Sequence, residues 1–205
     1  MLLLDFDGVL ATYTRADRLA ALARTSGCTP GTVAAVLFES GLERAYDSGA
    51  IDTVDYLQRV GSGLGCTIDE DAWIASRIAC SRADAAVLAL VADVAARVPV
   101  GVLTNNGPLM VQAMRHIVAP LYPMLEGRVL CSGALGARKP ERAIFERALA
   151  HFGALPQQTL FVDDLFVNVQ GARRAGLQAD TVSGARSMRK VLRRYALLPS
   201  RDAPA

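Results

Sequence analysis

The residues of this chain that could do chemistry are mostly carboxylates, and they come where short apolar runs of the sequence end. Carboxylate side chains can act as nucleophiles, as proton donors and acceptors, or as ligands of hard metal ions. A hydroxyl and a lysine in the same set could bind an anionic group. The set comprises Asp5, Asp7, Thr104, Asn105, Lys139, Asp163 and Asp164.

The four carboxylates predict a bound cation if they share one cleft, because they would otherwise repel one another. Mg²⁺ suits oxygen ligands, and it usually binds through one or two carboxylates while keeping several waters and a substrate phosphate. The motifs contain no His or Cys, which disfavours zinc. With Mg²⁺ and Lys139 neutralising charge, a phosphate dianion could approach a carboxylate nucleophile.

The apolar runs themselves predict the strands of a parallel sheet, because short continuous runs suit strands that are covered on both faces. Helical apolar spacing in residues 84–97 and 140–152 lies between them. This alternation indicates an α/β core with a parallel sheet of flavodoxin or Rossmann type. Ligands of such sheets lie at the carboxyl ends of strands, where the chemical residues would converge. The expected strands end at Leu4, Leu103, Cys131, Val162 and Val182.

Residues 14–83 break the alternation and read as helices throughout, at 15–26, 30–40, 42–47, 53–60 and 69–80. We therefore expect a core of residues 1–13 and 84–205 and an inserted small helical cap of residues 14–83. The stretch from Gly61 to Gly65 is expected to separate two cap helices. It is not a phosphate loop, because it lacks the Lys-Ser/Thr ending.

Four segments of the chain resemble, in order, the four motifs of the haloacid dehalogenase (HAD) superfamily. The helical block resembles the cap of the first HAD subfamily. Residues 38–49 are similar to the caps of sugar-phosphate phosphatases related to bacterial glucose-1-phosphate phosphatase and of the phosphatase domain of soluble epoxide hydrolase. The four segments are Leu4-Asp5-Phe6-Asp7-Gly8-Val9-Leu10, Leu103-Thr104-Asn105-Asn106, Arg138-Lys139-Pro140 and Phe161-Val162-Asp163-Asp164.

The resemblance implies a role for each catalytic candidate. Asp5 would be the nucleophile that forms an aspartyl-phosphate, which splits one difficult step into two easier ones. Asp7 would protonate the leaving alcohol and then deprotonate the attacking water. Thr104 and the backbone N–H of Asn105 would bind the phosphate, and Lys139 would steady both the nucleophile and the phosphoryl group.

The resemblance also implies a magnesium site. Mg²⁺ would be held by the Asp5 side chain, the backbone carbonyl of Asp7 and a carboxylate of the fourth motif. Asp164 aligns best as that ligand, with Asp163 behind it or binding directly. Asn168 would brace the site.

Each residue also has a simpler explanation when it is taken alone. Asp7-Gly8 could be only a turn, Lys139 only a surface lysine, and Asp163 only a helix cap. Four motifs in the expected order make these explanations weak together. Hydrolytic dehalogenases of the superfamily lack an acid at the position of Asp7, so its presence favours phosphoryl transfer over dehalogenation.

We therefore predict a HAD-type phosphatase that hydrolyses a small phosphate monoester with Mg²⁺, a sugar phosphate being one candidate. Two alternatives stay open: an intramolecular phosphomutase, which would share all four motifs, and a catalytically idle HAD-like domain that binds a ligand or partner. Substrate contacts are expected from the cap and the loop leading into it. The candidates by residue type are Tyr13, Arg15, Arg44 and Tyr46.

The resemblance implies a small phosphorylated metabolite as partner, and composition gives no sign of another class of partner. The net charge is +2, the pI is near 8.4, and no run of Lys or Arg stands out, so neither nucleic acid nor a membrane surface is expected. The four cysteines form no CxxC pair and suit reduced, buried thiols. The N-terminal stretch has no basic start and no long apolar run, so we expect neither a signal peptide nor a membrane span and a cytoplasmic location. We also expect a monomer or a homodimer.

Overall fold

The computed structural model describes residues 1–199, so the last six residues of the expected core lie outside the described part. A five-stranded parallel sheet in the order β5-β4-β1-β6-β7 forms the centre of the core. This confirms the predicted α/β fold class. Its strands are β1 (Leu2–Leu4), β4 (Val100–Thr104), β5 (Val129–Cys131), β6 (Leu160–Asp163) and β7 (Gln178–Thr181).

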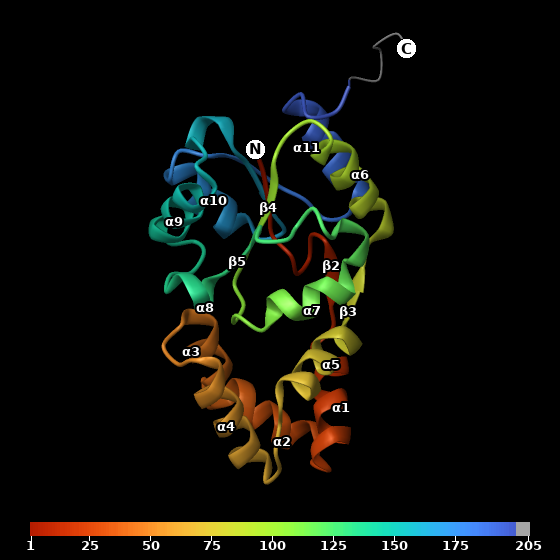
Figure 1. The fold of residues 1–205 in the computed structure, drawn as a ribbon, viewed down its shortest axis with the longest axis vertical. Coiled ribbons are helices and arrows are strands. Elements are labelled where there is room, and N and C mark those ends of the chain that lie inside the picture. Colours follow the sequence, from red (N-terminus) through yellow and green to blue (C-terminus); the bar gives the residue numbers. More distant parts are fainter. Residues whose placement is uncertain (200–205) are drawn as a thin grey trace.

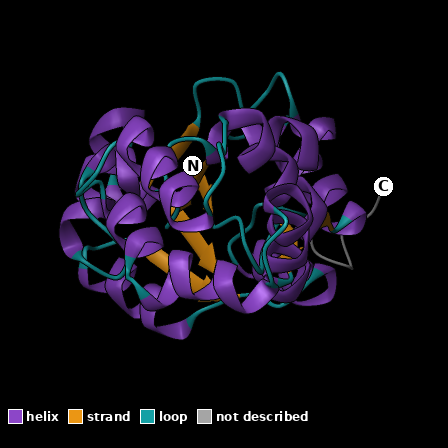
Figure 2. Ribbon diagram, turned by 90° about the horizontal axis from the view of Figure 1, so that it is seen from below, coloured by secondary structure: helices purple, strands orange, loops and turns teal. Residues whose placement is uncertain are grey.

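Helices cover both faces of the sheet, because alternate strand residues point to opposite sides. On one face, Leu3 and Phe161 pack with α9 and α10. On the other, Leu4 and Val162 pack with a larger cluster that includes residues of α6, α7 and α11. Figure 2 shows the strands enclosed between helices. The core helices are α6 (Ala85–Ala95), α7 (Met110–Ile117), α8 (Ser132–Leu135), α9 (Arg142–Phe152), α10 (Phe166–Arg174) and α11 (Ala185–Arg194), with short 3₁₀ turns η2 (Ala119–Leu121) and η3 (Pro156–Gln158).

The segment between β1 and α6 is helical except at its two ends. In Figure 1 its helices lie together at one end of the molecule, away from β4 and β5. Two short strands, β2 (Ala11–Tyr13) and β3 (Ser81–Ala83), pair antiparallel where this segment leaves and rejoins the core. The sequence did not predict this pair. The helices are α1 (Arg15–Ser26), α2 (Pro30–Ala34), the π-helix η1 (Ala35–Glu39), α3 (Leu42–Ser48), α4 (Thr53–Leu64) and α5 (Glu70–Cys80).

The interior of these cap helices holds a buried ion pair within an aromatic cluster. Arg18 of α1 pairs with Glu43 of α3, and the hydroxyl of Tyr56 donates to the same carboxylate. The indole N–H of Trp73 donates to Tyr56 Oη at 3.2 Å. The cap helices therefore have a packed interior of their own, while the division at residues 13/14 and 83/84 stays a prediction.

Two expected helix boundaries were wrong. Helix α4 runs through Gly61 and Gly63 to Leu64 rather than ending at residue 60. A β-carbon at Gly61 would lie 2.6 Å from the Cys66 carbonyl oxygen, and one at Gly63 would lie 2.8 Å from Val36, so these glycines serve close packing rather than a turn. Helix α9 begins at Arg142 rather than at residue 140, with Glu141 in extended conformation before it.

Among the described residues, no helix has both the length and the apolar character needed to cross a membrane.

Candidate active site

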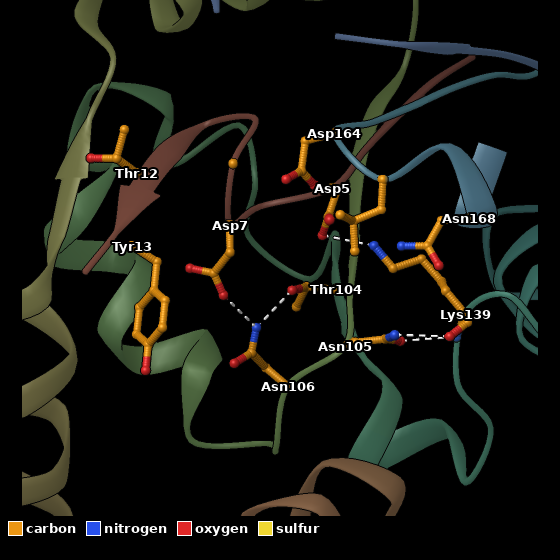
Figure 3. A pocket seen from close by; sticks show the side chains of 12 residues that line it. Asp5, Asp7, Thr12, Tyr13, Thr104, Asn105, Asn106, Lys139, Asp164 and Asn168 are labelled. Carbon is orange, nitrogen blue, oxygen red and sulfur yellow. Dashed lines mark hydrogen bonds and ion pairs between the residues drawn. The ribbon is translucent and has the colours of Figure 1, made fainter. Parts of the chain in front are cut away.

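A cavity of about 450 Å³ lies at the carboxyl ends of β1, β4 and β6. Parallel neighbours end at the same edge of a sheet, so residues distant in sequence meet there. Figure 3 shows side chains that follow these strands gathered around one space, with Thr12 and Tyr13 of β2 to one side of it. The lining residues are Asp5, Asp7, Gly8, Thr12, Tyr13, Thr104, Asn105, Asn106, Lys139, Asp164, Leu165 and Asn168.

Asp5 lies on the floor of this cavity and is almost wholly buried. Its Oδ1 accepts a hydrogen bond from the Phe6 backbone N–H at 2.7 Å and pairs with Lys139 Nζ at 2.7 Å. Burial raises the pKa of Asp5 to about 8, against the opposing charge of Lys139 and with the support of the neighbouring Asp163. An added cation would favour the ionised carboxylate.

Lys139 joins two carboxylates in the interior. Its Nζ lies 2.7 Å from Asp5 Oδ1 and 2.7 Å from Asp163 Oδ2. Lys139 loses solvation on burial, but the two carboxylates outweigh this loss and raise its pKa. Asp163 is fully buried, and both of its oxygens also accept from Asn168 Nδ2 at 3.0 Å. Its Oδ1 accepts from the Leu165 N–H as well, so Asp163 is occupied by protein donors.

Asp164 differs from its neighbour because it lines the cavity and is partly exposed. Burial and the adjacent Asp163 raise the pKa of Asp164. Gly8 has a φ of +83°, and a β-carbon there would lie 2.4 Å from Asp164 Oδ2. Glycine at this position therefore provides both the left-handed backbone and the space for this carboxylate.

Asp7 is held from two sides. Arg77 of α5 donates from Nη2 to Asp7 Oδ1 at 3.1 Å and to Oδ2 at 3.0 Å. Asn106 Nδ2 donates to Asp7 Oδ2 at 3.1 Å and to Thr104 Oγ1 at 2.8 Å. Neither partner was predicted from the sequence. Arg77 lies on a helix 70 positions away, with no motif around it. Asn106 belongs to the second HAD motif, but the motif assigns no role to it.

Asn105 and Lys139 are linked through the backbone. Asn105 Nδ2 donates to the Lys139 carbonyl at 3.0 Å, and the Lys139 N–H donates to Asn105 Oδ1 at 2.9 Å. The Asn105 side chain therefore fixes the segment that carries the lysine, in addition to any part its own N–H plays. Thr104 is buried at the end of β4, with its hydroxyl at the cavity wall.

The four residues that were expected to contact the substrate lie in different surroundings. Only Tyr13 lines the cavity. Arg15 stacks on the ring of Phe38 at 3.8 Å, Arg44 is exposed to solvent, and Tyr46 is fully buried, accepting from the Leu109 N–H. Leu165, which lines the cavity, and the next two residues of the chain, Phe166 and Val167, are apolar and more than half exposed.

The donor set fits a hard divalent cation. Carboxylate oxygens of Asp5, Asp163 and Asp164 all lie within 4.8 Å of one another. The raised pKa values of Asp5 and Asp164 reflect carboxylates that are buried without enough positive charge. Only oxygen ligands are present in this group, as Mg²⁺ prefers.

Comparison with known proteins agrees with the geometry. The sequence profile of haloacid dehalogenase-like hydrolases matches residues 1–176. The chain belongs to this family. The HAD superfamily membership indicated by the four short motifs is thereby confirmed.

Several solved HAD structures share the fold. A predicted HAD-like hydrolase from Porphyromonas gingivalis superposes with a TM-score of 0.78 at 20% identity, covering 97% of this chain and 98% of that one. A HAD family enzyme from Bacteroides thetaiotaomicron, crystallised with magnesium and inorganic phosphate, superposes with a TM-score of 0.72 at 19% identity, covering 89% of this chain and 93% of that one. An L-2-haloacid dehalogenase from Xanthobacter autotrophicus superposes with a TM-score of 0.60 at 19% identity, covering 97% of this chain and 84% of that one.

Sequence relatives match over a shorter stretch. A Mycobacterium tuberculosis protein named as a phosphatase is 38% identical over 80 residues, which cover 39% of this chain and 36% of that protein. An Aspergillus calidoustus drimenol cyclase is 32% identical over 83 residues, covering 36% of this chain and 16% of the cyclase. The aligned stretches thus span about a third or less of these relatives.

Proposed function

We propose that this HAD-like hydrolase cleaves a small phosphate monoester through an aspartyl-phosphate on Asp5. The observation that carries the proposal is the meeting of a nucleophile, an acid, a hydroxyl and a buried lysine in the wall of one cavity. The relatives crystallised with magnesium and phosphate, and the one named as a phosphatase, add support.

In the first step, a carboxylate oxygen of Asp5 attacks phosphorus as the bond between phosphorus and the ester oxygen breaks. Donors of the described residues contact Asp5 only at Oδ1, which leaves Oδ2 for the attack. Asp7 gives its proton to the departing oxygen, so that a neutral alcohol leaves. Thr104 and Lys139 bind phosphoryl oxygens while negative charge spreads over them.

In the second step, water attacks the phosphorus of the aspartyl-phosphate. Asp7, now ionised, takes a proton from that water. The bond between phosphorus and the Asp5 oxygen breaks, which restores the carboxylate and yields inorganic phosphate. Asp7 is again protonated and ready for the next ester.

Mg²⁺ would be held by Asp5, the Asp7 carbonyl and Asp164. Asp163 and Asn168 would lie behind these ligands and orient them. When bound, Mg²⁺ neutralises the carboxylates and polarises the phosphate. Asp163 is an unsuitable direct ligand, because Lys139, Asn168 and a backbone N–H already occupy its oxygens.

Phosphate release from a panel of esters, with Mg²⁺ or with EDTA, tests the proposal. The panel includes glucose 1-phosphate, glucose 6-phosphate, glycerol phosphate, hexyl phosphate and 4-nitrophenyl phosphate, because the exposed Leu165 side chain and the polar floor of the cavity suit different organic groups. Asp5→Asn is the matched variant. It should stay folded, bind phosphate, and lose nearly all turnover and all acid-stable phosphoenzyme.

Three other results would each replace the proposal. Fast interconversion of sugar phosphate isomers with slow phosphate release would indicate a phosphomutase. Halide release from 2-chloropropionate would indicate a dehalogenase. Binding of phosphate esters without any turnover, in protein that also binds Mg²⁺ weakly, would indicate an idle domain. A small metabolite as substrate, the cytoplasmic location, the lack of nucleic-acid and membrane partners, and a monomeric or dimeric state stay predictions.

A further inference from the structure

Arg77 is the cap residue that reaches the side chain of Asp7. It lies on the last turns of α5, and its side chain is only 3% exposed. Its Nη2 donates to both oxygens of Asp7. Burial of a guanidinium is costly unless its partners are well placed. An arginine buried against a half-buried carboxylate in the cavity wall therefore points to a specific role for this contact.

The two oxygens of Asp7 are not equivalent. Oδ2 accepts from Arg77 at 3.0 Å and from Asn106 at 3.1 Å. Among residues 1–199, Oδ1 accepts from Arg77 alone, at 3.1 Å. A carboxylate oxygen offers two lone pairs, so Oδ2 is filled while Oδ1 keeps one position. The oxygen with the spare position is the one that can carry a proton to and from the substrate.

Both donors are themselves fixed. The guanidinium of Arg77 lies 4.8 Å from the ring of Tyr13, and Tyr13 pairs in the β2–β3 ladder with Ser81, four residues after Arg77. Asn106 is tied to the core through Thr104 Oγ1, as Figure 3 shows. The carboxylate of Asp7 is thus oriented by one group from the cap and one from the core.

We infer that Arg77 is a positioning residue for proton transfer, which together with Asn106 turns Asp7 so that Oδ1 carries the transferred proton. The inference rests on the proposed phosphatase function. In the first step the proton passes from Asp7 Oδ1 to the ester oxygen as that oxygen leaves phosphorus. In the second step a proton of the attacking water returns to Oδ1.

This role predicts a dependence on the leaving group. An alkoxide is strongly basic and needs the proton, whereas 4-nitrophenolate leaves readily without it. The constant kcat/KM reports the steps up to release of the alcohol, and so isolates the first proton transfer from the second. Loss of Arg77 should therefore affect alkyl esters far more than the aryl ester, whereas a general loss of structure would affect both alike.

The experiment compares kcat/KM for hexyl phosphate and 4-nitrophenyl phosphate in Mg²⁺-loaded wild type, Arg77→Ala, Arg77→Lys and Arg82→Ala. Arg82 is exposed and close in sequence, so Arg82→Ala controls for loss of one cap arginine. General acid catalysis contributes about 10²–10⁴-fold, so we expect Arg77→Ala to lose roughly 10²-fold on the alkyl ester and less than about tenfold on the aryl ester. Arg77→Lys should restore part of the alkyl activity.

Equal losses on the two esters, or no loss on either, would overturn the role of Arg77. If Arg77→Ala does not fold, Arg77→Lys carries the same test. Both contacts with Asp7 come from Nη2, and the shorter lysine side chain does not place its amine there, so Arg77→Lys should again show the larger loss on the alkyl ester. Wild type that releases phosphate from no ester of the full panel would instead overturn the phosphatase proposal, and this inference with it.

Discussion

Replacing Lys139 by Met should destabilise the metal-free protein strongly, although Met has a similar length. The lysine side chain is 1% exposed and is 2.7 Å from both Asp5 and Asp163. Removing one partner of a buried ion pair costs about 3–5 kcal/mol, because the other charge stays buried. Burial and Asp163 already raise the pKa of Asp5 to about 8 despite Lys139, so at pH 7 Asp5 can take up a proton instead. We therefore expect the free energy of unfolding to fall by the lower end of this range, about 3 kcal/mol.

Thermal unfolding followed by circular dichroism in EDTA at pH 7 measures this cost. For a chain of this size about 1 kcal/mol corresponds to roughly 2–4 °C, so Tm should fall by roughly 6–12 °C. The sequence has one other lysine, Lys190, which is exposed on α11. Lys190→Met is the matched control, and should change stability by less than about 0.5 kcal/mol.

Mg²⁺ adds a second measurement. If the divalent ion takes over the neutralising charge of the lysine, it should raise the Tm of Lys139→Met more than that of wild type. Equal stability of Lys139→Met and Lys190→Met in EDTA would refute the argument that Lys139 neutralises buried carboxylates. An equal Mg²⁺ response in wild type and Lys139→Met would refute the shared electrostatic site.

Two further predictions follow from other residues. Burial and Glu43 raise the pKa of Asp47 from 3.8 to about 7. The folded protein therefore binds a proton here more tightly than the unfolded chain does, and it loses stability as the pH rises from about 4 to 7 and that proton is released. At about 1.36 kcal/mol per pKa unit, this loss of stability is at most about 4 kcal/mol. Because the side chain is partly exposed, Asp47→Asn should gain about 1–3 kcal/mol over wild type at pH 8 and almost nothing at pH 4, by urea unfolding; an equal gain at both pH values would contradict this. Gly8→Ala should lose about 1–2 kcal/mol of stability from its left-handed backbone and bind Mg²⁺ more weakly by calorimetry, whereas Gly27→Ala, with a φ of +70° and open space around it, should lose stability only. Equal Mg²⁺ affinities for the two variants would rule out a role for the space beside Asp164.

The strand ends and their chemical residues could be predicted from the sequence because the signal is local. Leu2–Leu4 and Leu160–Val162 are continuous apolar runs, each followed at once by carboxylates. In a parallel sheet, adjacency of strands brings such ends together. The prediction that Asp5, Thr104, Lys139 and Asp164 line one cavity needed only that rule and the four motifs.

The boundaries within the cap could not be predicted in the same way. Gly61 and Gly63 are helix-weakening residues by propensity, and the sequence suggested a break there. Helix α4 nevertheless continues to Leu64, and glycine at these positions leaves space for the Cys66 carbonyl of the helix's own C-terminal turn and for Val36. The contact of Gly63 with Val36 joins separate segments, so no local pattern encodes it.

The sequence by itself determined the sheet, the helical insertion and the order of the acidic motifs, because short apolar runs and helical spacing act over a few residues. Only the tertiary structure decided how the acids differ. It buried Asp163 against Lys139 and Asn168, left Asp164 at the cavity wall, and brought Arg77 onto Asp7 across 70 positions of chain. Charge and solvation depend on neighbours in space, so identical aspartates acquired distinct surroundings only when the chain folded.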